Sequence, residues 1–335
     1  MRKVGIQCTI GPSCADAWVI AQMINAGARV FRFNLSHATA ADQEDKYQAV
    51  LDARKMTGQD DVKIMFDLRG PEVRLKDLPG DSLEWETGEI ITLPEVTYDN
   101  LINEVKAGTL MLIDDGKIRL EVKEIKGRDI ICEVLLGGIV KSRKGINVPD
   151  VKMQMPYLRA DDMADIIWCA KHDVDYIAGS FIRRADDVRV LRDFINKNGG
   201  DKIEIIAKLE NKEAVDNLEA IAGVADQIMV ARGDLGVEVG YENVPALQKR
   251  LCRRCEALGK PIIIATQLLE SMITSNVPTR AEVSDIANAV YDGATDLLVT
   301  GETAAGEHPV EVIQELVKIV DVAEHDLARY GNQLL

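Results

Sequence analysis

Strand-like and helix-like segments alternate along this chain, and that order constrains the fold more than any other feature. The predicted strands are 4–8, 29–33, 63–67, 176–180, 204–209, 227–231, 261–266 and 296–299. Predicted helices follow at 15–25, 40–56, 160–171, 185–196, 212–221, 245–258, 280–291 and 309–330. Some strands, such as the three isoleucines at 262–264, are apolar throughout, as expected for strands buried on both faces. The pattern predicts an α/β fold, a (β/α)8 TIM barrel, with an open doubly wound sheet as the alternative.

The alternation breaks between residues 70 and 149. Glycines are frequent there, short β-type runs appear, and helical spacing is absent. We therefore expect a small all-β module inserted after the third strand. The expected barrel then comprises residues 1–69 and 150–335, and the inserted module comprises residues 70–149.

Charge and composition narrow the classes of function. The formal net charge of −15 disfavours broad binding to nucleic acid or to an anionic membrane, since both require a surplus of Lys and Arg. The negative net charge is compatible with binding of phosphorylated substrates, because a local group of cations and metals can hold them. No apolar run approaches the roughly 20 residues that span a bilayer. The six scattered cysteines fit reduced thiols, so we expect a cytoplasmic protein.

Polar side chains follow most predicted strands, at the ends that meet at one mouth of a barrel. They mix carboxylates, cations and hydroxyls: Arg32, Asn34, Ser36, His37, Asp67, Arg69, Glu72, Arg74, Lys208, Glu210, Arg232, Asp234, Thr266, Gln267, Thr300, Glu302 and Thr303. Stability alone favours fewer buried charges, so this set indicates a functional site.

Three of these residues suit the chemistry of phosphoryl transfer. Lys208 lies two residues before Glu210, so both side chains point to the same side of an extended strand. Glu210 and Asp234, on neighbouring strands, can supply the carboxylates that Mg²⁺ prefers. Gly233 lies at a strand-to-helix transition, where free N–H groups attract a carboxylate or phosphate. Taken singly, the pairs Lys208–Glu210 and Arg232–Asp234 are equally well explained as simple salt bridges.

Several short strings carry a resemblance to a known family. They are CTIGP at 8–12, RFNLSH at 32–37, GPEVR at 70–74, DDG at 114–116, KGINVP at 144–149, SFIR at 180–183, KLEN at 208–211, MVARGDLGVE at 229–238, ATQ at 265–267, PTRAE at 278–282 and GETA at 301–304. In this order they resemble the pyruvate kinases. The resemblance implies metal-dependent phosphoryl transfer from phosphoenolpyruvate to ADP, giving pyruvate and ATP in glycolysis.

The resemblance also implies roles for individual residues. Catalytic or substrate-binding roles fall on Lys208, Thr266, Arg32, Gly233 and Asp234. Lys208 would bridge the transferring phosphoryl group, and Thr266 would orient the substrate and help to protonate the enolate. Glu210 and Asp234 would bind Mg²⁺ or Mn²⁺, while the amides of Gly233 and Asp234 would receive the substrate carboxylate.

Further roles concern potassium, the nucleotide and the inserted module. The implied K⁺ ligands are Asn34, Ser36, Asp67 and the carbonyl of Leu68, and Glu72 matches family members that need potassium. The implied nucleotide-binding residues are Asn34, His37, Arg74 and Lys144, with Arg32 beside them. The β module would be a lid that closes over the barrel mouth and excludes water.

The sequence departs from the family pattern at a few positions. Ala305 stands where a lysine is usual, which removes a cation on the nucleotide side. Leu68 and Arg69 replace Thr-Lys, and Thr300 replaces a commoner serine. A phosphotransferase acting on another small hydroxy or keto acid, a metal-dependent aldolase and a catalytically degenerate homologue therefore remain alternatives. The nucleotide cations Arg74 and Lys144 favour the kinase.

The family usually continues past the eighth helix into a C-terminal regulatory domain, whereas this sequence ends at Leu335. The resemblance thus implies an enzyme without the effector site, and a homo-oligomer, either a dimer or a tetramer, built through barrel contacts. Sugar-phosphate effectors are then expected to leave the substrate saturation curve unchanged. A clear shift of that curve in a steady-state assay would refute this expectation.

Overall fold

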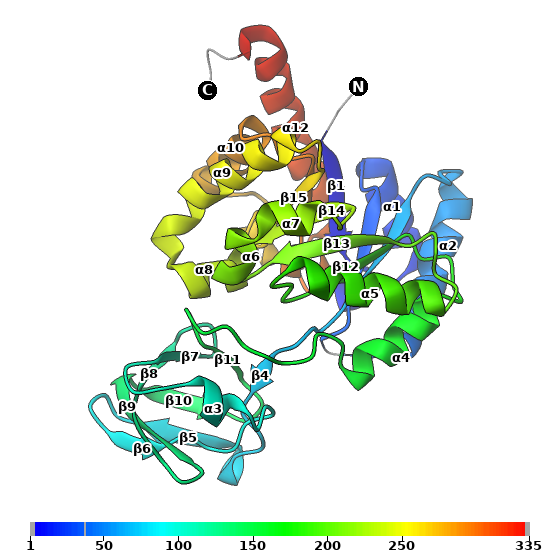
Figure 1. Cartoon of the computed structure of the whole chain (residues 1–335). Coiled ribbons are helices and arrows are strands. Elements are labelled where there is room, and N and C mark those ends of the chain that lie inside the picture. The colour runs from blue at the N-terminus through cyan, green and yellow to red at the C-terminus, as the bar shows by residue number, and fades with distance from the viewer. Residues whose placement is uncertain (1–3, 37, 332–335) are drawn as a thin grey trace.

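Eight parallel strands close into a barrel in the order β1-β16-β15-β14-β13-β12-β3-β2 in a computed structural model that describes residues 4–36 and 38–331 (Figure 1). The strands are β1 (Gly5–Thr9), β2 (Val30–Asn34), β3 (Lys63–Asp67), β12 (Tyr176–Gly179), β13 (Glu204–Leu209), β14 (Gln227–Ala231), β15 (Ile262–Ala265) and β16 (Asp296–Val299). The predicted TIM barrel is confirmed, and the open doubly wound sheet is excluded because β1 pairs with both β2 and β16.

Both faces of the barrel strands are buried, which explains their apolar sequences. The side chains that fill the barrel interior are Val30, Met65, Ala178, Ile206, Met229, Ile263, Ala265 and Leu298. Their neighbours in sequence, such as Ile64 and Ile264, point outward into the larger core beneath the helices. Because successive strand residues alternate between faces, the polar residues that follow each strand are left at the mouth.

The helices surround the barrel (Figure 1). They are α1 (Ala17–Ala26), α2 (Glu44–Thr57), α4 (Ala160–Cys169), α5 (Ala185–Lys197), α6 (Lys212–Asp216), α7 (Leu218–Ala222), α8 (Arg232–Val239), α9 (Val244–Ala257), α10 (Arg280–Tyr291), α11 (Gly301–Ala304) and α12 (Pro309–Tyr330). Short 3-10 helices lie at Pro12–Cys14, Ala41–Gln43, Pro79–Asp81, Tyr241–Asn243 and Glu270–Ile273. The single helix expected at 212–221 is two helices, divided at Asn217, and α8 was not expected as a separate helix.

Capping residues explain where two of these helices begin. The Asp16 carboxylate accepts a hydrogen bond from the Trp18 N–H at the start of α1. Thr279 and Glu282 form a reciprocal capping box at the start of α10. By contrast, α8 follows β14 without a loop and contains two glycines, so its sequence gives a weak helical signal.

Two antiparallel sheets are inserted between β3 and α4. Their elements are β4 (Val73–Arg74), β5 (Ser82–Trp85), β6 (Ile90–Thr92), α3 (Leu101–Glu104), β7 (Leu110–Ile113), β8 (Ile118–Lys126), β9 (Asp129–Leu136), β10 (Gly138–Lys141) and β11 (Gly145–Asn147). The larger sheet has the order β4-β11-β7-β8-β9-β6, and β10 pairs with β5. Figure 1 shows this β module lying beyond one end of the barrel, joined to it by two chain segments. It has its own apolar core, which includes Trp85, Leu120 and Val134.

The helices lack the properties of membrane-spanning segments in the described residues. In the part of the chain that the structure describes, no helix combines the length and the apolar character that a bilayer crossing requires.

Gly70 lies where the chain leaves the barrel for the β module, and its geometry yields a stability prediction. Its φ is 69°, and a Cβ there would lie 2.4 Å from the carbonyl oxygen of Ser180. We expect Gly70→Ala to lower the free energy of unfolding by about 2–4 kcal/mol, because backbone strain adds to a backbone clash. Urea denaturation followed by circular dichroism measures this loss.

Gly58 supplies the matched control for this substitution. Its φ is 65°, yet a Cβ there would meet nothing within 4 Å. Gly58→Ala should therefore cost only about 1 kcal/mol, from the left-handed backbone alone. Equal losses in the two variants would show that the contact with Ser180 is unimportant.

Candidate active site

The ammonium group of Lys208 lies at the centre of a buried polar cluster where the barrel strands end. Its Nζ is 2.8 Å from Glu210 Oε1 and 3.2 Å from Asp67 Oδ1. It also donates a hydrogen bond to Ser180 Oγ at 2.7 Å. These partners come from β13, β3 and the segment after β12, so closure of the barrel is what brings them together.

The charges in this cluster offset one another. Burial raises the pKa of Asp67, but Lys208 and Arg32 outweigh that effect and hold it below its usual range. Burial lowers the pKa of Lys208, yet the two carboxylates more than compensate, and its pKa lies above the ordinary value. Burial raises the pKa of Glu210, with Asp234 and Asp67 acting in the same direction against Lys208. A bound cation would stabilise the charged form of a carboxylate whose pKa is raised by burial.

Arg32 extends the cluster across β2 and β1. Its Nε donates to Asp67 Oδ2 at 2.7 Å, and its Nη1 donates to Thr9 Oγ1 at 3.1 Å. The second Asp67 oxygen, Oδ1, accepts from both Lys208 and Ser180. The Asp67 carboxylate therefore fixes the orientation of two cations on separate strands.

Asp234, Gly233 and Thr266 form the other side of the site. Asp234 lies in the first turn of α8, and burial raises its pKa, with Asp115 and Glu72 contributing against Lys208. The Gly233 N–H donates to Thr266 Oγ1 at 2.9 Å. Lys208 thus contacts Glu210 directly, and Thr266 contacts Gly233, the residue that precedes Asp234.

The expected potassium ligands lie on adjacent strand ends. Asn34 and Asp67 are paired in the β2–β3 register, and Asn34 Oδ1 accepts from the Ser36 N–H at 3.1 Å. Leu68 directly follows β3, and its N–H donates to the carbonyl of Ala178 at 3.0 Å. The structure thus places these four residues at the ends of the neighbouring strands β2 and β3.

The expected nucleotide cations lie at the base of the β module. Arg74 pairs with Glu72 at 2.6 Å, and Lys144 pairs with Asp114 at 2.6 Å. Arg74 is on β4 and Lys144 directly precedes β11, and these two strands are hydrogen-bonded neighbours. Asn34 is on the barrel side, and His37 lies outside the described residues.

The candidate metal ligands are the carboxylates of Glu210 and Asp234. Across residues 4–36 and 38–331, no group of three or more His, Cys, Asp or Glu side chains could hold a metal ion. Glu210 and Asp234 nevertheless fit a magnesium site, since Mg²⁺ is commonly bound by one or two protein carboxylates together with substrate oxygens. Glu210 is buried and Asp234 is half-buried, and the hard oxygen donors of these two carboxylates are what favours that fit.

Sequence reasoning missed some residues of the site and misplaced others. Ser180 contacts both Lys208 and Asp67, and its position directly after β12 was the signal that could have identified it. Arg232 pairs with Asp285 at 2.8 Å, so the alternative of an Arg232–Asp234 turn pair is wrong.

The polar residues after β16 have structural partners. The Glu302 carboxylate accepts from the N–H groups of Leu269 and Thr300. Thr303 Oγ1 donates to the carbonyl of Thr9 at 2.9 Å and accepts from its N–H at 3.1 Å. These hydrogen bonds connect the segment after β16 to the end of β1 and to the segment after β15.

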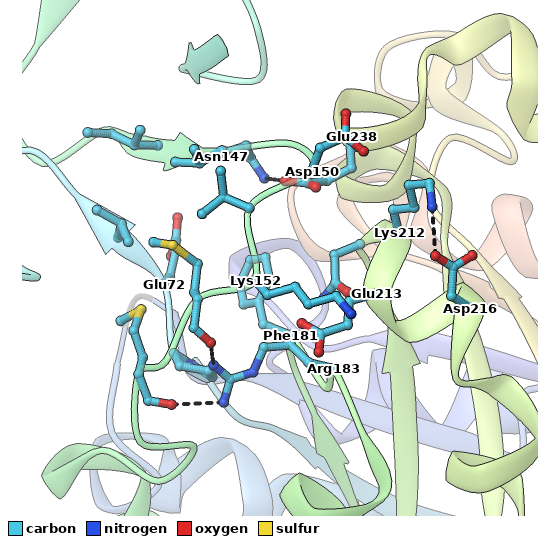
Figure 2. A pocket seen from close by; sticks show the side chains of 18 residues that line it. Glu72, Asn147, Asp150, Lys152, Phe181, Arg183, Lys212, Glu213, Asp216 and Glu238 are labelled. Atoms are coloured by element: carbon cyan, nitrogen blue, oxygen red, sulfur yellow. Dashed lines mark hydrogen bonds and ion pairs between the residues drawn. The ribbon is translucent and has the colours of Figure 1, made fainter. Parts of the chain in front are cut away.

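A cavity of about 160 Å³ opens beside the cluster, between the base of the β module and the barrel (Figure 2). Its wall includes Glu72 and Phe181, and the Phe181 N–H donates to Glu210 Oε2 at 2.6 Å. Figure 2 shows Arg183 holding the returning chain through the carbonyls of Met153 and Met155, each at 2.9 Å. The cavity therefore lies at the junction of the two parts, and Phe181 in its wall contacts Glu210 of the cluster.

Comparison with known proteins gives a consistent result. The family model described as "Pyruvate kinase, barrel domain" matches residues 1–313. The pyruvate kinase of Bacillus licheniformis is 42% identical over 98% of this chain, and that of Clostridium acetobutylicum is 39% identical over 98%. The chain spans 58% of the first protein's length and 72% of the second's. The crystal structure of a pyruvate kinase from Cryptosporidium parvum matches with a TM-score of 0.92 and 37% identity, covering 97% of this chain and 70% of that one.

Glu238 yields a pH prediction. It lies in the second half of α8, and Asn147 of β11 donates to its Oε1 at 3.1 Å. Burial raises the pKa of Glu238 to about 7, from an ordinary value of 4.5. The folded state thus binds this proton more tightly than the unfolded chain, and stability from this group falls as pH rises from about 4.5 to about 7.

We expect Glu238→Gln to remove this part of the pH dependence. The glutamine keeps an oxygen that can accept from Asn147 and cannot ionise. Relative to wild type, the variant should gain about 1–2 kcal/mol between pH 5 and pH 8, a figure reduced for partial exposure. Urea unfolding at several pH values in metal-free buffer measures it, with the exposed Glu256→Gln as control. Parallel profiles for wild type and Glu238→Gln would contradict the assignment.

Proposed function

Because the chain belongs to the pyruvate kinase family, we propose that it transfers the phosphoryl group of phosphoenolpyruvate to ADP, giving pyruvate and ATP. A β-phosphate oxygen of ADP attacks the phosphorus as the bond to the enol oxygen breaks. The enolate that remains takes a proton at its methylene carbon and becomes pyruvate. Such a reaction needs charge neutralisation and positioning more than covalent catalysis.

The buried ammonium of Lys208 is the observation that carries this proposal. A lysine held in its charged form by Asp67 and Glu210 can stabilise the negative charge of a phosphoryl group in transit. Ser180 restricts the direction of the ammonium through a hydrogen bond of 2.7 Å. The charge is therefore oriented before substrate arrives, which is the condition for effective electrostatic catalysis.

Glu210 and Asp234 are the proposed ligands of Mg²⁺ or Mn²⁺. When bound, the ion supplies a Lewis acid that neutralises oxygens of the substrate. The proposed potassium ligands are Asn34, Ser36, Asp67 and the carbonyl of Leu68. Family membership supports metal dependence in general, and the choice of these ions is part of the proposal.

The remaining residues bind and orient the substrates in this proposal. The amides of Gly233 and Asp234, at the start of α8, receive the substrate carboxylate, which shares the Gly233 N–H with Thr266 Oγ1. The helix dipole favours the negative charge of that carboxylate. Thr266 then lies beside that carboxylate and takes part in protonating the enolate. The nucleotide phosphates are held by Arg32, Asn34, His37, Arg74 and Lys144.

We propose that residues 70–149 form a lid over the barrel, which comprises residues 1–69 and 150–335. The cavity between the two parts supports this role, since closure there would exclude water from the cluster. The cytoplasm is the proposed location, because all six cysteines are free thiols buried in the protein. A homo-oligomer, dimer or tetramer, is the proposed assembly.

A coupled assay for pyruvate formation tests the proposal, using Lys208→Met. The variant should lose about 100- to 1000-fold in kcat, because the transferring phosphoryl group loses its cation. Lys318→Met is the matched control, since Lys318 is exposed on α12, where it pairs with Glu315. Circular dichroism establishes that both variants fold. Unchanged turnover in a folded Lys208→Met variant would remove the assigned role.

The same assay with and without potassium tests the ion site. Activity should fall when K⁺ is replaced by a large organic cation, because the oxygens of Asn34, Ser36, Asp67 and Leu68 suit a desolvated monovalent ion. Absence of any pyruvate from the wild-type protein would favour another hydroxy or keto acid as substrate, or a degenerate homologue.

A further inference from the structure

The two residues directly after β15 have an unusual backbone conformation. Thr266 has a φ of 73° and Gln267 a φ of 52°, both in the left-handed region. This region is strained for a β-branched residue such as threonine. Such strain persists only where surrounding contacts determine the conformation of the backbone.

The guanidinium of Arg232 supplies these contacts. Its Nη2 donates to the carbonyl of Thr266 at 2.7 Å and to that of Gln267 at 3.3 Å, and its Nε donates to the Thr266 carbonyl at 3.3 Å. The side chain is buried beneath the mouth of the barrel. One planar group therefore holds both carbonyls of the strained turn.

Two helices in turn hold the guanidinium. Its Nη1 donates to Asp285 of α10 at 2.8 Å and to Gln248 of α9 at 3.3 Å. Gln248 donates to Asp292 at 3.0 Å, which fixes its amide. All the N–H groups of Arg232 thus have acceptors, and its charge is balanced by Asp285. Three rotatable donors of a lysine cannot reproduce this arrangement.

The backbone that follows Arg232 contacts the same turn. The N–H of Gly233 donates to Thr266 Oγ1 at 2.9 Å. The Arg232 guanidinium fixes the position of the Thr266 carbonyl, and the N–H of Gly233 fixes the position of the Thr266 hydroxyl. The position of that hydroxyl relative to the start of α8 is therefore fixed from two sides.

We propose that Arg232 is a positioning residue that holds the turn at Thr266 and Gln267 so that the Thr266 hydroxyl faces the substrate. This inference rests on the proposed function, in which Thr266 takes part in protonating the enolate. A side chain displaced by about 1 Å from its productive position can cost about 100-fold in rate. Stability alone would be served by glycine or asparagine in a left-handed turn, without a buried arginine.

The decisive variant is Arg232→Lys, which keeps the buried positive charge. It should lower kcat by about 100-fold while KM for phosphoenolpyruvate changes by less than about threefold, as expected when only transition-state alignment is lost. Arg254→Met is the control, because Arg254 also pairs with a carboxylate, Glu219, but on the exposed surface. Its kcat should equal that of wild type.

A second measurement separates positioning from general stability. In D₂O, a proton leaves the methyl carbon of pyruvate, its electron pair passes to the carbonyl oxygen as the enolate forms, and a deuteron returns. Proton NMR of this exchange, with Mg²⁺, K⁺ and inorganic phosphate present, reports on Thr266 without phosphoryl transfer. Arg232→Lys should slow the exchange by about 100-fold, and adding Gln267→Gly should restore at least about tenfold by relieving strain in the turn.

Several outcomes would overturn the inference. They are wild-type kcat in Arg232→Lys, unchanged proton exchange, or a loss of activity that only parallels the fraction unfolded. If wild type forms no pyruvate, the proposed function fails, and crystal structures of the wild type and Arg232→Lys still decide the positioning. Thr266 should leave the left-handed region, and the Gly233 N–Thr266 Oγ1 distance should lengthen beyond a hydrogen bond. An unchanged turn in that variant would overturn the inference.

Discussion

A buried ammonium group shared by two carboxylates is the interaction on which the candidate site depends. Lys208 neutralises the buried carboxylates of Asp67 and Glu210, and Arg32 pairs with Asp67 Oδ2. Removing one partner of such a cluster leaves an uncompensated buried charge, at a cost of about 3–5 kcal/mol. The arrangement is therefore poor as a stabilising device, and its retention is explained by what the oriented charge can do for a phosphorylated substrate.

The barrel makes this cluster possible because it brings the ends of non-adjacent segments together. Lys208 is on β13, while Asp67 is on β3, 141 residues earlier in the chain, and β12 lies between them. Parallel pairing places equivalent ends at the same mouth, so a polar residue placed after one strand meets its counterparts from the others. Packing of the barrel interior with apolar side chains below the mouth then keeps the cluster at a fixed depth.

The strands and most of their polar ends could be predicted from sequence because the signals are local. An apolar run followed by a charged residue marks a strand end without knowledge of its neighbours. The partner of Arg232 could not be predicted in this way, since Asp285 lies 53 residues away on α10 while Asp234 is two residues away. The left-handed turn at Thr266 was also hidden, because neither residue of the turn is glycine or asparagine.

The helix α8 connects the two parts of the proposed enzyme. Its first residue holds the turn after β15, Asp234 of its first turn is a proposed metal ligand, and Glu238 contacts Asn147 of the β module. Eight residues in a helix form a rigid rod of about 12 Å, so a force applied at one end reaches the other. The contacts of Arg232 with the turn after β15, with α9 and with α10 oppose displacement of the first residue of α8. In the proposed closure of the lid, the β module would move against the far end of α8, and the hydrogen bond between the Gly233 N–H and the Thr266 hydroxyl would be kept.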